Sequence, residues 1–209
     1  EKYGPDSIML TGSSRGPGNE ANYVMQKFTR ACVGTNNIDN CARTCHAPSV
    51  IGLMDTIGSG AMSVSIPGLE EAACIMLFGY NPAASHPIVA SRIVKAKERG
   101  ATLIVADPRV IETARIADIH IQMKNGSNLA LLNAMAYTIV EEGLVDKAFV
   151  DAHTKGYESW LDVVMQYSPE AVEDTVGVSA DLIREAARTY AQAETSIIGW
   201  GMGVTQQRQ

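Results

Sequence analysis

An adjacent cysteine and histidine, Cys45 and His46, carry side chains that can do chemistry together. A thiolate is a nucleophile and a soft metal ligand, and an imidazole exchanges a proton near neutral pH. The pair lies in a polar segment before Pro48, not on an apolar helix face. Cys41 precedes Cys45 by four residues, a wider gap than in a zinc knuckle, and no second Cys/His pair stands where a closed zinc site needs one. Spacing alone leaves two interpretations open, a metal ligand with an adjacent base or an ordinary polar loop.

Three loops rich in glycine and small polar residues form a second candidate site. Each follows a predicted strand and precedes a helix, which suits a ligand that carries phosphates and a ribose. The loops are Gly79-Tyr80-Asn81-Pro82, Asp107-Pro108-Arg109 and Asn125-Gly126-Ser127-Asn128. Asp107 can accept hydrogen bonds from ribose hydroxyls, and Arg109 can donate two hydrogen bonds to a phosphate. Any one of these loops is also typical of a plain turn, but three of them at one edge favour nucleotide binding.

The elements that must position these loops alternate between strand and helix. We expect strands over residues 7–11, 74–78, 102–106, 119–123 and 197–201, and helices over residues 20–33, 86–99, 129–142, 147–152, 157–167 and 180–194. Continuous apolar strands separated by amphipathic helices predict an α/β fold, a parallel sheet covered on both faces. Right-handed crossovers would then bring the loops after the strands to one edge, where ligands bind in this architecture.

Two finer expectations concern packing. The helix over 86–99 should end at Gly100 and bury four aliphatic residues, namely Ile88, Val89, Ile93 and Val94. Four unevenly spaced cysteines in a chain of this length do not indicate a disulfide scaffold. We therefore interpret Cys32 and Cys74 as small buried hydrophobic residues.

Composition excludes several classes of protein. The chain has 209 residues with 46% hydrophobic content, enough for one domain or two small ones. Seventeen Lys and Arg against twenty-three Asp and Glu give a net charge of −6, which argues against a nucleic-acid partner or an anionic membrane. The longest apolar run, Ala72 to Phe78, has seven residues, far fewer than the roughly 20 of a membrane span. The composition predicts a soluble, acidic, globular protein.

The two ends of the sequence suggest a piece of a longer polypeptide. It opens on Glu1 without an initiator methionine or a signal peptide, and it closes soon after an apolar, glycine-containing run. We expect a cytoplasmic location, and we leave the periplasm open because an export signal would lie outside this segment.

Six stretches carry a resemblance to a known family, and they occur in the family's order along almost the whole chain. They are Ser13–Glu20 (SSRGPGNE), Cys41–Ser49 (CARTCHAPS), Phe78–Pro87 (FGYNPAASHP), Ala106–Arg109 (ADPR), Lys124–Asn128 (KNGSN) and Trp200–Gln206 (WGMGVTQ). Together they resemble the catalytic subunit of molybdenum- or tungsten-dependent formate dehydrogenases, within the bis-molybdopterin guanine dinucleotide oxidoreductase superfamily. The resemblance is to the form that carries cysteine in place of selenocysteine.

The resemblance implies a Rossmann-like, doubly wound fold and the two-electron oxidation of formate to CO2. No standard side chain accepts a hydride, so a cofactor must do so; here it would be a bis-molybdopterin guanine dinucleotide with Mo or W. Cys45 would ligate the metal and His46 would act as the adjacent acid or base. Residues 1–50 would form part of a pterin-facing segment with the Cys-His loop, and residues 51–209 the α/β dinucleotide-binding domain.

The resemblance also implies a set of cofactor-binding residues. They are Arg15, Gly79, Tyr80, Asn81, Asp107, Pro108, Arg109, Gly126, Ser127, Asn128, Met202, Gly203 and Gln206. Two positions depart from the family: Ala84 stands where relatives can carry an acid, and Asn128 stands where many members have Asp. Asp would recognise the guanine amino edge more strongly than Asn.

Parts of the family's machinery would lie outside this segment. A domain with a 4Fe–4S cluster would precede Glu1, and the arginine that pairs with formate would follow Gln209. Formate or CO2 and an electron-transfer subunit, an iron–sulfur or flavin protein, are the expected partners. Three alternatives stay open: a nitrate-reductase-type enzyme, a cofactor-free electron-relay subunit with the same fold, and an NAD-binding module. The last lacks the G-x-G-x-x-G fingerprint.

Overall fold

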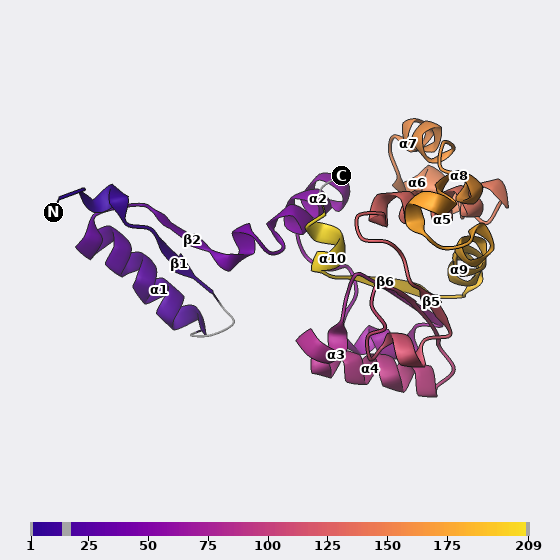
Figure 1. The fold of residues 1–209 in the computed structure, drawn as a ribbon, viewed down its shortest axis with the longest axis horizontal. Coiled ribbons are helices and arrows are strands. Elements are labelled where there is room, and N and C mark those ends of the chain that lie inside the picture. Colours follow the sequence, from indigo (N-terminus) through magenta and orange to yellow (C-terminus); the bar gives the residue numbers. More distant parts are fainter. Residues whose placement is uncertain (1, 14–17, 208–209) are drawn as a thin grey trace. The chain divides into compact units, whose positions relative to one another are not determined.

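The computed structural model describes residues 2–13 and 18–207, and the chain forms two compact units, Glu1–Ala61 and Met62–Gln209. Figure 1 draws both as ribbons. Arg15, a predicted cofactor-binding residue, lies outside the described residues. Within the described ranges, every helix is too short or too polar to span a bilayer.

The first unit pairs two short parallel strands with a helix. Strands β1 (Leu10–Gly12) and β2 (Ile38–Asn40) are joined through α1 (Gly18–Phe28), which continues as a π-helical segment over Thr29–Val33. Gly34, at φ +85°, ends that segment in a left-handed conformation. A 3₁₀ turn, Cys41–Arg43, then leads to α2, Ala47–Ile57. The sequence had predicted neither β2 nor α2.

The described part of this unit has no buried apolar side chain. Its buried residues are two threonines, Thr29 and Thr35. The aromatic side chains of α1 are solvent-exposed in this unit, with Tyr23 at 66% and Phe28 at 49% exposure. Cys32 is exposed as well, so its interpretation as a buried hydrophobic residue is wrong.

The second unit is built on a four-stranded parallel sheet with the strand order β5-β4-β3-β6. Its strands are β3 (Cys74–Phe78), β4 (Thr102–Ala106), β5 (Ile119–Ile121) and β6 (Ser196–Trp200). The predicted parallel α/β fold is confirmed, including the return of the last strand to the sheet. In this sheet β3 is central and lies between β4 and β6.

Helices cover both faces of the sheet. Figure 1 shows α3 (Pro82–Ser85) and α4 (Pro87–Glu98) on one face, and α5 (Asn128–Glu141), α8 (Pro169–Val176) and α9 (Ala180–Gln192) on the other. The remaining helices of the unit are α6 (Lys147–His153), α7 (Tyr157–Val164) and α10 (Met202–Thr205). The sequence had not predicted α8, although Ser168 caps it through Ala171 N–H and Pro169 occupies its first turn.

Strand β3 explains why the apolar run is continuous. Cys74, Met76 and Phe78 pack into the apolar cluster under α5 and α9. Ile75 and Leu77 pack into the cluster under α4. Successive side chains of a strand point to opposite faces, so a strand covered on both faces must be apolar at every position.

The covering stripe of α4 is narrower than predicted. Ile93 is buried and Val89 packs against the same cluster, but Ile88 is 70% exposed and Val94 is 38% exposed. The expectation that Ile88 and Val94 are buried is wrong. Each is one residue away from the stripe formed by Val89, Ile93 and Ala96, a rotation of about 100° around the helix.

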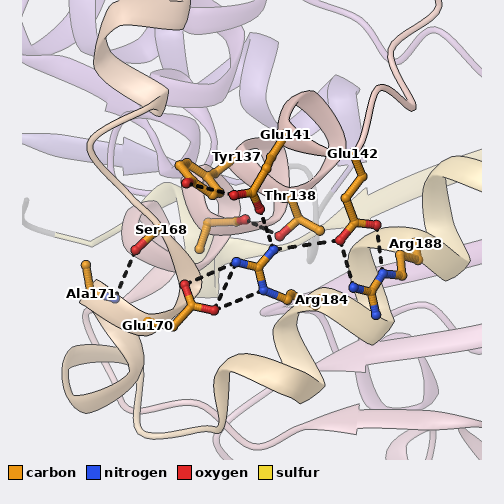
Figure 2. A network of polar contacts seen from close by, with 10 residues as sticks. Tyr137, Thr138, Glu141, Glu142, Ser168, Glu170, Ala171, Arg184 and Arg188 are labelled. Atoms are coloured by element: carbon orange, nitrogen blue, oxygen red, sulfur yellow. Dashed lines mark hydrogen bonds and ion pairs between the residues drawn. The ribbon is translucent and has the colours of Figure 1, made fainter.

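A network of ion pairs joins α5, α8 and α9, as Figure 2 shows. Arg184 of α9 donates to Glu141 of α5 at 2.6 Å and to both carboxylate oxygens of Glu170 of α8 at 3.0 and 3.1 Å. Arg188 makes two hydrogen bonds of 2.7 Å to Glu142. Arg184 is the shared member, and it connects the three helices on this face of the sheet.

Replacing Arg184 should loosen α8 in a pH-dependent way. Arg188 holds the pKa of Glu142 below its ordinary 4.5, and the α8 backbone followed by Arg184 lowers that of Glu170. These carboxylates therefore stabilise the fold above about pH 4.5, and their contribution disappears as the pH falls through the lowered pKa values. We expect R184Q to speed hydrogen–deuterium exchange in α8 at pH 7, and the difference from wild type to shrink as the pH falls below 4.5 through the lowered pKa values.

An exposed arginine provides the control. Arg115 makes no ion pair in the described ranges, so R115Q should leave exchange in α8 unchanged. Equal exchange of R184Q and wild type at pH 7 would show that the network does not stabilise α8.

Candidate functional site

The strand order places a crevice at the carboxyl ends of the strands. From β3 the chain crosses one face through α4 to reach β4, whereas β6 arrives on the other side of β3 after α9, which covers the opposite face. The connections on the two sides of β3 thus run over opposite faces of the sheet. In open parallel sheets this switch point is where ligands bind.

A pocket of about 210 Å³ lies at this edge. Its lining comes from the loops after β3, β4, β5 and β6: Gly79, Asn81, Asp107, Pro108, Arg109, Met123, Asn125, Asn128, Gly203 and Gln207. The structure thus brings residues of all three predicted loops to one site. The volume is below the roughly 300–1,000 Å³ of sites that enclose a drug-sized ligand, so the pocket suits one part of a larger molecule.

Several predicted site residues lie next to this pocket without lining it. They are Tyr80, Gly126, Ser127, Met202 and Gln206. The Ser127 hydroxyl donates to Lys124 O at 2.7 Å, and the Tyr80 side chain packs against the apolar cluster under α4.

Three lining residues were not among the predicted ones. Met123 and Asn125 lie within the predicted strand and loop after 118, so their position along the chain was a usable signal. Gln207 gave no such signal, because it reaches the pocket only through the turn that follows α10.

Glycines let two loops meet at the floor of the pocket. Gly203 N–H donates to Gly79 O at 3.2 Å, and Gly79 itself has φ +55°. A Cβ on Gly79 would lie 2.9 Å from the Gly203 backbone, and one on Gly203 would lie 2.8 Å from Gly79 Cα. Real Cβ atoms do not approach backbone this closely. The loops after β3 and β6 can therefore touch only where side chains are absent.

Asp107 and Arg109 form the charged part of the pocket. Asp107 is 6% exposed, and its Oδ1 accepts the Arg109 N–H at 2.8 Å, which closes a tight turn. The Arg109 guanidinium is far more exposed, and its Nε lies 3.9 Å from the same oxygen. The Asp107 carboxylate, fixed by this turn, thus lies beside the exposed Arg109 guanidinium. The carboxylate suits ribose hydroxyls and the guanidinium suits a phosphate.

The start of α5 places a polar side chain at the pocket. Asn128 is 4% exposed and lines the pocket. Ser127 precedes it but does not cap the helix. The first backbone N–H groups of a helix have no partner within the helix, and a polar or anionic ligand can supply one.

Cys45 and His46 lie in the first unit, at the turn that leads into α2. Cys45 is partly buried and its N–H donates to Ala42 O at 3.2 Å. His46 Nδ1 lies 3.2 Å from Ser49 Oγ, which restrains the ring, and His46 O accepts the Val50 N–H at 2.9 Å. Cys45 and His46 thus lie side by side in the chain directly before α2, with His46 at the N-cap position.

The side chains around Cys45 decide which kind of metal site could form there. Among residues 2–13 and 18–207, no group of three or more His, Cys, Asp or Glu side chains is placed to hold a metal ion. A metal on Cys45 would need its other ligands from a cofactor or from elsewhere. This fits a metal carried by organic dithiolenes better than a protein-built zinc site.

Together, the parallel sheet with helices on both faces and the polar pocket at its carboxyl edge define a Rossmann-like α/β domain. The chain belongs to the molybdopterin oxidoreductase family, which matches residues 1–209. The resemblance inferred from the sequence motifs is thereby confirmed.

Individual relatives agree with this assignment. The chain is 62% identical over 206 residues to formate dehydrogenase H of Escherichia coli K12, covering 99% of this chain and 29% of that protein. It is 44% identical to F420-dependent formate dehydrogenase 1 subunit alpha of Methanococcus maripaludis, covering 99% of this chain and 30% of that protein. Acetylene hydratase from Pelobacter acetylenicus superposes with a TM-score of 0.80 at 27% identity, covering 99% of this chain and 28% of its own. The chain thus spans less than a third of the length of these relatives.

Proposed function

We propose that the complete protein is a formate dehydrogenase, which oxidises formate to CO2 at a molybdenum or tungsten centre. The observation that carries this proposal is the 62% identity to formate dehydrogenase H across 99% of the chain. The F420-dependent formate dehydrogenase alpha subunit, 44% identical, supports the same substrate class. Formate gives up two electrons and a proton as CO2 forms, and the protein's side chains cannot store the electrons.

The second unit would bind the nucleotide end of a bis-molybdopterin guanine dinucleotide. Asp107 would accept hydrogen bonds from a ribose, and Arg109 would pair with the diphosphate. Asn128, which lines the pocket at the start of α5, would bond the base or a phosphate. Tyr80, Gly126 and Ser127 would lie around this end of the cofactor, and Met202, Gly203 and Gln206 would lie against its pterin region. Arg15 is a further residue that we assign to cofactor binding. When bound, the pterin-held metal supplies the two-electron acceptor.

The first unit would present Cys45 and His46 to the metal. The Cys45 thiolate would ligate it, and the His46 imidazole would accept the proton released from formate. The Ser49 hydroxyl, 3.2 Å from Nδ1, would keep the imidazole ring in one orientation.

Electrons would leave through an iron–sulfur cluster and a partner subunit. An electron-transfer subunit of the iron–sulfur or flavin type is consistent with a relative named as an alpha subunit.

Analysis of the purified full-length protein tests this function. We expect about one Mo or W atom per chain, release of guanine nucleotide on acid treatment, and formate-dependent reduction of a dye. Protein without Mo and W, or metal-loaded protein that reduces nitrate but leaves formate untouched, would contradict the proposal.

A further inference from the structure

The loop after β4 is held by two side chains of the neighbouring edge strand. Ile119 and Ile121 of β5 face the apolar cluster under α5 and α9. Because side chains alternate along a strand, His120 and Gln122 project to the other side. Both reach the loop that carries Asp107 and Pro108.

Each of the two side chains bonds a backbone carbonyl of that loop. His120 Nε2 lies 3.1 Å from Asp107 O, and Gln122 Nε2 donates to Pro108 O at 3.0 Å. A carbonyl oxygen can only accept. The Nε2 atom of His120 must therefore carry the proton, which both its neutral Nε2–H form and its cation provide.

Asp107 is consequently fixed at three points. Its N–H donates to Ile121 O at 3.2 Å, its carbonyl accepts from His120, and its carboxylate accepts the Arg109 N–H at 2.8 Å. The carbonyls of Asp107 and Pro108 are engaged on the β5 side. These hydrogen bonds reduce the repulsion that the partial negative charge of the two carbonyl oxygens would exert on an anion in the pocket.

We propose that His120 and Gln122 are positioning residues of the pocket, which set the loop over 107–109 so that Asp107 and Arg109 meet the ribose and diphosphate. This inference rests on the proposed function, because it takes the pocket as the site for the nucleotide end of the cofactor. Neither side chain touches that ligand in this account. Both act through the backbone of the loop.

The sheet does not depend on these two side chains. Backbone pairing of β4 with β5 joins Ile104 to Ile119, Val105 to His120 and Ala106 to Ile121. The His120 and Gln122 side chains belong to neither apolar cluster, and their hydrogen bonds go to the loop. Removing them should therefore loosen the loop and leave the fold in place.

The test compares His120 variants in the full-length protein. H120L removes the donor, and H120Q keeps an amide that can donate. In protein prepared without cofactor, GDP is the probe, with its Kd measured by calorimetry. We expect H120L to weaken GDP binding roughly 10- to 100-fold, as loss of an outer-shell partner commonly does, and H120Q to recover most of that loss.

Local exchange and cofactor content provide readouts independent of activity. H120L should speed hydrogen–deuterium exchange in a peptide covering residues 106–110 and leave exchange in β3 unchanged. In cofactor-loaded preparations of H120L, released guanine nucleotide per chain should fall. H153L, on α6 and away from the pocket lining, is the matched control. Gln122 is exposed, so Q122L serves as a second variant if H120L does not fold.

The outcomes separate this inference from the proposed function. Wild-type protein that neither binds GDP nor contains guanine nucleotide would overturn both. Wild type that binds GDP, together with H120L and Q122L that bind it equally well and exchange at the wild-type rate, would overturn the positioning role alone.

Discussion

Replacing Cys45 with alanine should reduce formate-dependent dye reduction by roughly 10³-fold or more, equivalent to about 4 kcal/mol of activation barrier. The thiolate is the one protein ligand that we assign to the metal, and an alanine methyl group cannot replace it. Because the proposed cofactor is also held through its nucleotide end, C45A should retain guanine nucleotide. Activity would thus fall much further than nucleotide content, and measuring both on one preparation separates a ligand role from a loss of cofactor binding.

The chain offers a matched cysteine for comparison. Cys32 is exposed at the π-helical segment after α1, so C32A should keep wild-type activity, nucleotide content and metal content. A C45A enzyme with wild-type turnover would refute the assigned metal ligand, whatever the behaviour of C32A.

The parallel sheet was predictable because a strand buried on both faces consists of consecutive apolar residues. Every residue of β3 is at most 1% exposed, and side chains buried to this extent on both faces of a sheet are apolar. The glycine and polar residues that follow β3, β4 and β5 mark the ends of the strands. Parallel strands bring those ends to one edge. The location of the pocket therefore followed from local patterns alone.

Contacts that depend on register and on helix rotation were not predictable in this way. His120 reaches the Asp107 carbonyl because β5 pairs beside β4 with His120 opposite Val105, and periodicity does not encode that pairing. Ile88 and Val94 match a generic apolar stripe, yet α4 buries only the narrower one that contains Ile93.

The lining of the pocket was also predictable in part, by loop but not by individual residue. Asp107 and Asn128 line it as the loop composition suggested, whereas Ser127 turns back to Lys124 O. Gln207 lines the pocket and the adjacent Gln206 does not. A shift of one residue at the end of α10 decides between them, and no propensity resolves a boundary to one residue.

The glycine contact beneath the pocket leads to the other large expected effect. G79A must place an alanine at φ +55° and a methyl carbon 2.9 Å from the Gly203 backbone. The left-handed conformation costs about 1–2 kcal/mol, and overpacking against backbone adds about 1–3 kcal/mol. Because backbone cannot rotate away as a side chain can, the loops after β3 and β6 would separate. We expect a lower Tm in the full-length protein and loss of most bound guanine nucleotide.

A second glycine isolates the steric part of this effect. Gly143 has φ +68°, but a Cβ there would meet nothing within 4 Å. G143A therefore has only the cost of the left-handed backbone conformation and no steric clash. It should lower the Tm slightly while nucleotide content stays at the wild-type level. The difference between G79A and G143A measures the contact between the two loops. If both variants kept wild-type nucleotide content, close approach of the Gly79 and Gly203 backbones would not be needed to form the pocket.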